Sequence, residues 1–304
     1  MISIIGSGRV GTSIAFLCMS HVLDNVLLVN RNENKAIGES LDISNTIPFN
    51  SEFSIQGTSD YSKIMGSNII IITASTGAYQ NNRYENTISQ ATTIKDIAKK
   101  IKLYCPDAIV LVISNPLDVL TYVFQKETLF SRFKVIGIAS SLDSSRFRYL
   151  ISEKFSIPQS FISNALVLGE HGDSMVPIFS GVSVDGSKLS SILDVNEKIT
   201  MTNNIRNYWK RLRAYKSRSQ FGIAKQTYDV VEAIHNLKEI TIPASIVLEG
   251  EYGESDVAMG VPVKINKNGV SEIQTLDLNE SESILLKESS HIIKDQLRSV
   301  FSNF

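Results

Sequence analysis

The sequence lacks the marks of several protein classes. Its 304 residues include two cysteines, Cys18 and Cys105, without metal-like spacing, so we expect neither a shared disulfide nor a metal site. The longest apolar runs, such as Asn68–Ala74 and Ala108–Ile113, have the length of buried strands and are too short to cross a bilayer. The chain has 30 basic and 31 acidic residues, and this balance of charge gives no reason to expect a nucleic acid partner.

No signal-peptide pattern opens the chain, since an apolar strand begins almost at once with Ile2, Ile4 and Ile5. The cytoplasm is therefore the expected compartment. The composition is that of an ordinary globular protein, with 43% hydrophobic and 20% charged residues. At this length one hydrophobic core usually gives way to two lobes, and we place their boundary so that residues 1–141 and 142–304 form two domains.

The first half of the chain alternates short apolar strands with amphipathic helices. This pattern is typical of a parallel sheet with both faces covered, so the sequence predicts an α/β, doubly wound fold. The strands are expected near residues 2–5, 26–29, 53–56, 68–73, 108–113 and 134–138, and the helices near 10–21, 34–43, 85–103 and 117–126.

The regular alternation of strands and helices ends after about Ser140, and the second half is predicted to be a mixed α/β domain. A hairpin is indicated by Asn268-Gly269, because this pair readily adopts the positive φ angles of a tight turn. Its strands are expected near 261–265 and 270–276, after a helix from 143 to 155, strands near 164–168 and 178–184, and helices between 196 and 237. The terminal helix carries one apolar face, which we expect to pack on the body of the protein or on a partner subunit: Leu285, Ile292, Ile293, Leu297 and Val300.

A glycine-rich turn follows the first strand and opens the first helix. In this segment Gly6 permits the turn, Gly8 lets a pyrophosphate approach the backbone, and Gly11 allows close packing of helix on strand. Arg9 and Val10 lie between the last two glycines. The alternative is a glycine turn without a ligand, but the strand-turn-helix context favours dinucleotide binding and a Rossmann fold.

The end of the second strand leaves the choice of dinucleotide open between NAD and NADP. NAD enzymes usually place an acidic residue there to bind the adenosine ribose, whereas this chain has Asn30 followed by Arg31. Asn30 removes a charge that would repel a 2′-phosphate, and Arg31 offers a cation beside it. Alternatively, Arg31 faces solvent and NAD is still preferred.

One histidine is framed by glycines just after an apolar strand, in the segment Gly169-Glu170-His171-Gly172-Asp173. Upstream, a three-residue spacing puts Asp143 and Arg146 on one face of a helix. Taken singly, these residues have structural explanations: a helix cap, a surface ion pair and a buried histidine. Together they indicate an acid, a guanidinium and an imidazole facing one site.

Two further features accompany these residues and the glycine turn: the segment Asn115-Pro116-Leu117-Asp118 after the fifth strand and a polar loop after the fourth. Taken together, they make the sequence resemble the lactate/malate dehydrogenase family along nearly its whole length. The resemblance implies that His171 is the proton donor and acceptor, that Asp143 orients its ring, and that Arg146 grips the C1 carboxylate of a small 2-hydroxy or 2-oxo acid.

The resemblance also assigns two residues beside the reacting carbonyl. It implies that Arg83, in the loop 76–85, polarises the carbonyl as the loop closes, and that Asn115 bonds the carbonyl or hydroxyl oxygen, often with a cis peptide before the following proline, here Pro116. A homodimer or homotetramer is implied as well. No metal is expected, and no membrane partner.

The substrate loop departs from the family pattern and leaves the substrate open. The family usually has a discriminating residue, arginine for malate and glutamine for lactate, which falls here near Ala78 or Tyr79 in a loop one residue short. A second discriminating position falls on Ser219. Malate and lactate chemistry therefore remain alternatives, and so does a drifted paralogue that binds nucleotide without turnover. Another Rossmann oxidoreductase, such as an NAD-dependent glycosidase, lacks the support of a metal-ligand cluster.

Overall fold

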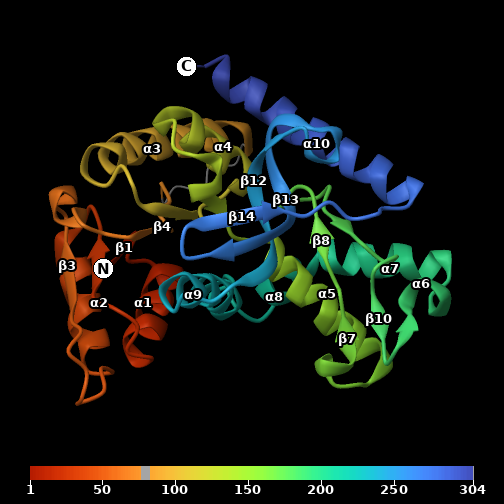
Figure 1. Ribbon diagram of the computed structural model, residues 1–304, viewed down its shortest axis with the longest axis horizontal. Helices are drawn as coiled ribbons and strands as arrows, with labels where there is room; N and C mark the ends of the chain where they lie inside the picture. The colour runs from red at the N-terminus through yellow and green to blue at the C-terminus, as the bar shows by residue number, and fades with distance from the viewer. Residues whose placement is uncertain (77–82, 304) are drawn as a thin grey trace.

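The computed structural model describes residues 1–76 and 83–303, apart from the side chains of residues 83–85 (Figure 1). Its centre is a nine-stranded sheet in the order β14-β13-β12-β6-β5-β4-β1-β2-β3. In this view residues 1–60 lie on the left, the elements between residues 140 and 206 lie on the right, and the strands β12 to β14 lie between them.

Six strands of the first half form the parallel part of the sheet. Because β1 pairs with both β2 and β4, the strand order reverses there, and such a switch point is where doubly wound sheets bind ligands. The six strands are β1 (Ile2–Ile5), β2 (Val26–Val29), β3 (Ile55–Thr58), β4 (Ile69–Ile72), β5 (Ile109–Val112) and β6 (Val135–Gly137). The predicted fold is confirmed, with the third strand starting two residues later than expected.

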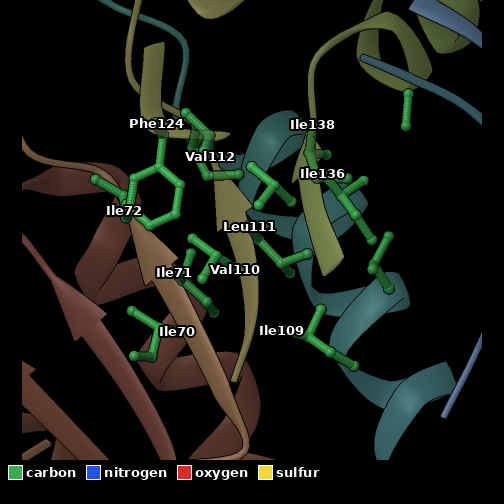
Figure 2. Close-up of a cluster of buried hydrophobic side chains, with 14 of the residues drawn as sticks. Ile70, Ile71, Ile72, Ile109, Val110, Leu111, Val112, Phe124, Ile136 and Ile138 are labelled. Carbon is green, nitrogen blue, oxygen red and sulfur yellow. The ribbon is translucent and has the colours of Figure 1, made fainter. Parts of the chain in front are cut away.

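The middle strands carry unbroken apolar runs because helices cover both faces of the sheet. Figure 2 shows the side chains of β4 and β5, such as Ile71 and Leu111, packed together with Phe124 of α4 and Ile136 of β6. The helices of this half are α1 (Arg9–Ser20), α2 (Glu33–Ser44), α3 (Arg83–Tyr104) and α4 (Leu117–Thr128).

The second half begins with α5 (Ser140–Phe155), which starts three residues before the predicted helix. Its inner face joins a separate small core around Phe147 and Ile151. The short strands and helices that follow are β7 (Ile162–Ser163), β8 (Val167–Leu168), β9 (Val176–Pro177), β10 (Ser183–Val184), β11 (Ser187–Lys188), α6 (Leu189–Ile192), α7 (Val195–Arg206), α8 (Tyr208–Arg213) and α9 (Phe221–His235). The helix α9 packs on α1 and belongs to the main core.

Three antiparallel strands of the second half extend the sheet of the first. They are β12 (Ile240–Glu249), β13 (Ser255–Asn266) and β14 (Gly269–Ile273), and β12 pairs with β6. The strand β12 was not predicted, and the proline within its apolar run is unusual for a central strand. In the structure Pro243 lies opposite Pro262, a pairing suited to a non-hydrogen-bonded position since neither residue has an N–H.

The predicted hairpin is present, but its turn differs in detail. Asn266 pairs with Gly269, whose φ is 99°, whereas Asn268 does not take the positive φ expected of it. The ladder shifts register between Lys264 and Ile265, as in a bulged hairpin that places one glycine in the left-handed region.

The last helix, α10 (Glu280–Phe301), packs on β13 and α4. The expected packing face is right for Ile293, Leu297 and Val300, which are buried. Leu285 and Ile292 are exposed, so they are not part of the face that packs on the body of the protein. None of the helices in the described part of the chain has the length and apolarity that a bilayer crossing requires.

Candidate active site

The glycine turn has the geometry that a dinucleotide phosphate requires. Gly6 has a φ of 115°, and a Cβ on Gly11 would lie 2.0 Å from the Gly6 carbonyl oxygen, so side chains are excluded at both positions. A Cβ on Gly8 would meet nothing within 4 Å, so this backbone is open to an approaching group. No side chain caps α1, and its first N–H groups are therefore available to an anion.

Residues of the second half border the glycine turn. The exposed Arg9 donates a hydrogen bond to the hydroxyl of Ser217, and Gln220 Nε2 donates to Ser13 Oγ at 2.8 Å. Val10 packs against the main core. No local pattern indicates these contacts, because they join residues more than 200 positions apart.

At the end of β2, Asn30 connects the strand to the glycine turn. Its Nδ2 donates to Ser7 Oγ at 2.7 Å, and its Oδ1 accepts from the backbone N–H of Asn32 at 3.0 Å. Arg31 is exposed beside it. The roles predicted for Asn30 and Arg31 toward the adenosine ribose remain predictions.

The structure brings Asp143, Arg146 and His171 together. The His171 Nδ1 lies 2.5 Å from Oδ2 of Asp143, and Arg146 Nη1 donates to Oδ1 of the same carboxylate at 3.0 Å. Asp143 is 1% exposed, whereas Arg146 and His171 keep 11% and 18% of their side-chain surface open. The helical spacing of Asp143 and Arg146 does place them on one face, but their direct ion pair was not predicted.

The surroundings of His171 favour its protonated form. Burial lowers the pKa of His171, but the charge and hydrogen bond of Asp143 outweigh burial and Arg146, so the pKa lies above its ordinary value. Because Nδ1 faces Asp143, its proton is held there and Nε2 is left to face a substrate. None of the described residues bonds to Nε2.

The backbone around His171 is held from several sides. Gly169, with a φ of 81°, pairs with Gly260 through two backbone hydrogen bonds of 2.9 Å. The N–H of Glu170 donates to Ser289 Oγ of α10 at 2.8 Å, and the N–H of His171 donates to Asp118 Oδ2 at 2.7 Å. The short loop after β8 therefore has a defined path.

Of the two remaining predicted site residues, the structure describes Asn115 fully and Arg83 in part. Asn115 is exposed at the carboxyl end of β5, and the Asn115–Pro116 peptide is cis. Arg83 is the first residue of α3, but its side chain and residues 77–82, which include Ala78 and Tyr79, lie outside the described part. One neighbour was missed: the guanidinium carbon of Arg146 lies 5.2 Å from the centre of the Tyr208 ring.

The fold and this group of residues define an NAD-binding oxidoreductase. Residues 1–137 match the lactate/malate dehydrogenase NAD binding domain, and residues 140–304 match the lactate/malate dehydrogenase alpha/beta C-terminal domain. The chain belongs to the lactate/malate dehydrogenase family, as the sequence predicted. Hydride transfer between NAD and small hydroxy or oxo acids is the chemistry of this family.

Relatives of both substrate types are similar over the whole chain. The malate dehydrogenase of Aeropyrum pernix is 37% identical over 300 residues, covering 97% of this chain and 96% of the relative. The L-lactate dehydrogenase 1 of Clostridium acetobutylicum is 35% identical over 317 residues, covering 99% and 98%. These near-equal identities do not distinguish the two substrates.

The solved structures agree with this picture. The Aeropyrum pernix malate dehydrogenase structure has a TM-score of 0.92 at 34% identity and covers 98% of both chains. The lactate dehydrogenase of Cryptosporidium parvum, solved with lactic acid and nicotinamide adenine dinucleotide, has a TM-score of 0.93 at 36% identity and covers 98% of this chain and 97% of that one.

Proposed function

We propose that the protein is an active 2-hydroxy acid dehydrogenase in which His171 carries the proton and Arg146 holds the substrate carboxylate. The single observation that supports this most strongly is the buried carboxylate of Asp143, bonded to both side chains at once. A catalytically drifted paralogue would have no reason to keep this three-residue arrangement.

His171 moves the proton in both directions. NAD(H), when bound, supplies or accepts the hydride. During reduction of a 2-oxo acid, Nε2 of His171 donates a proton to the carbonyl oxygen, and during oxidation it takes the proton from the hydroxyl. Asp143 fixes the ring through Nδ1 and stabilises the imidazolium.

Arg146 has donors enough for two tasks. A guanidinium offers five N–H groups, and the structure shows one of them on Asp143, so others are left for the two oxygens of a C1 carboxylate. The guanidinium also lies over the Tyr208 ring, 5.2 Å from its centre, a cation–π arrangement. We assign Arg83 to polarising the substrate carbonyl and Asn115 to bonding its oxygen, beside the cis peptide.

The glycine turn and the end of β2 would hold the cofactor. Gly6, Gly8 and Gly11 with the N-terminus of α1 fit a pyrophosphate. Asn30 and Arg31 would adjoin the ribose, and their lack of negative charge favours tolerance of NADP beside NAD.

The substrate loop favours a 2-oxo acid with a small or apolar tail. Between Thr76 and Glu85, Arg83 is the one basic residue, and it is assigned to the carbonyl. Burying the second carboxylate of oxaloacetate without a cation would cost several kcal/mol. Malate chemistry would need a cation from elsewhere in the chain or from a neighbouring subunit.

We also propose a homodimer or homotetramer in the cytoplasm, with residues 1–141 and 142–304 as the cofactor and substrate domains. Exposed apolar side chains such as Leu41 and Phe49 support self-association, and two buried free thiols, Cys18 and Cys105, fit a reducing compartment. Light scattering of the purified protein tests the assembly.

The activity itself is tested by following NADH oxidation with a panel of 2-oxo acids, including pyruvate and oxaloacetate. An active dehydrogenase should turn over at least one of them at about 1–1000 per second. A chain that binds NADH tightly and turns over none would be the drifted paralogue.

A further inference from the structure

A second buried carboxylate, that of Asp118, lies beside His171. It belongs to the segment Asn115–Asp118 that contributes to the family resemblance, but neither the resemblance nor the proposed mechanism gives it a role. Asp118, in the first turn of α4, is 3% exposed. Its Oδ2 accepts from the backbone N–H of His171 and its Oδ1 accepts from the hydroxyl of Ser245 on β12, both at 2.7 Å. The side chain of Asp118 therefore connects the backbone of the catalytic loop to α4 and β12.

Keeping a carboxylate here is costly. Burial raises the pKa of Asp118 to about 6, although the bonds from Ser245 and His171 act to lower it. A neutral amide could accept the same backbone N–H without the cost of a buried charge. The negative charge therefore calls for an explanation other than packing.

The charges around the imidazole supply that explanation. Among the described residues, the charged groups that act on His171 are Asp143 and Arg146 from α5 and Asp118 from α4, while Glu170 acts on Asp118. The guanidinium of Arg146 offsets the charge of Asp143, so these two alone leave no net charge for an imidazolium. With Asp118 included, the two carboxylates balance the guanidinium of Arg146 and the protonated ring of His171, and these four groups carry no net charge.

We propose that Asp118 is a positioning residue of the dehydrogenase: it fixes the backbone of His171, and its negative charge stabilises the protonated imidazole. The inference rests on the proposed role of His171 as the proton carrier. The effect of Asp118 on the imidazole is greatest above pH 6, where its carboxylate is ionised.

The test is Asp118→Asn, which keeps an acceptor for the His171 N–H and removes the charge. The matched control is Glu282→Gln on α10, a buried carboxylate that likewise accepts from a backbone N–H and a hydroxyl, those of Ser180 at 3.0 and 2.6 Å. Two readouts are taken: the NMR titration of the His171 ring in the full-length protein without cofactor, and the pH profile of kcat/KM for 2-oxo acid reduction.

In Asp118→Asn the titration midpoint of His171 should move to lower pH, and kcat/KM at pH 7.5 should fall by about three- to tenfold, the size of a half to one unit change in pKa. The difference from wild type should narrow below pH 6, where Asp118 is itself protonated. Glu282→Gln should change neither the His171 titration nor the pH profile of kcat/KM.

Ser245→Ala provides a second route if Asp118→Asn does not fold. Loss of the hydroxyl donor makes Asp118 harder to ionise, so the His171 midpoint should shift the same way by a smaller amount. An unmoved His171 titration in the folded variant overturns the inference. That result differs from failure of the proposed function, which would show as near-native turnover after replacement of His171 itself.

Discussion

The carboxylate of Asp143 and the imidazole of His171 are in direct contact, with Oδ2 and Nδ1 2.5 Å apart. The carboxylate comes from the first turn of α5 and the imidazole from the loop after β8, so the contact joins the start of the second half to its catalytic loop. It fixes the ring with Nε2 directed away from Asp143, and the following predictions depend on this orientation.

Asp143→Asn should lower kcat for 2-oxo acid reduction by about 100-fold or more, because an amide neither stabilises the imidazolium nor selects its tautomer. The NADH dissociation constant, measured by fluorescence, should not change, since the glycine turn is elsewhere. A variant with kcat within about threefold of wild type would show that Asp143 only packs the site.

The two reaction directions should depend on pH in opposite ways. The pKa of His171 is raised, so 2-oxo acid reduction, which needs the imidazolium, should be constant at low pH and fall only above the ordinary histidine range. Oxidation of the hydroxy acid should rise over the same interval. The stability that protonated His171 contributes is likewise present at low pH and lost as pH rises through the raised value. Reduction that increases with pH across this interval would contradict the assignment.

Asn30→Asp should shift the enzyme toward NAD by about 1–3 kcal/mol, or roughly five- to 150-fold in the NADH/NADPH ratio of kcat/KM. The aspartate can still accept from Asn32 N–H, as Asn30 does, and adds a charge that repels a 2′-phosphate. Asn32→Asp is the matched control, because it places the same charge on the cap of α2, where its oxygen accepts from Lys35 N–H. Wild-type enzyme without measurable NADPH use would disprove the idea.

If the substrate loop alone sets specificity, pyruvate-like acids should be preferred over oxaloacetate. The comparison is steady-state kcat/KM for oxaloacetate against pyruvate with NADH. A preference for oxaloacetate above about a hundredfold, roughly 2.7 kcal/mol, would mean that a cation outside the loop residues completes the pocket.

Local signals explain what the sequence could predict. The glycine turn, the parallel strands and the shared helix face of Asp143 and Arg146 each depend on neighbours within a few positions, and all three appear in the structure. The strand β12 was not predicted, and Pro243 within it is locally a strand breaker. The structure accommodates this proline opposite Pro262, at a position where neither residue needs an N–H.

Contacts between distant residues could not be predicted in this way. Asp118 and His171 are 53 positions apart, and Arg9 reaches Ser217 across the two halves of the chain. Nothing near Asp118 in sequence indicates that its carboxylate meets the catalytic loop. Such pairs depend on how the hairpin of β12 and β13 completes the sheet and brings the second half against the first.

The most direct test of the central claim is the turnover of His171→Asn with the preferred 2-oxo acid and NADH. Asparagine keeps a polar side chain of similar reach but cannot deliver a proton, so kcat should fall by about a hundred- to ten-thousandfold while NADH binding stays intact. Near-native turnover of this variant, with NADH bound as tightly as in wild type, would contradict the assignment of His171 as the proton carrier.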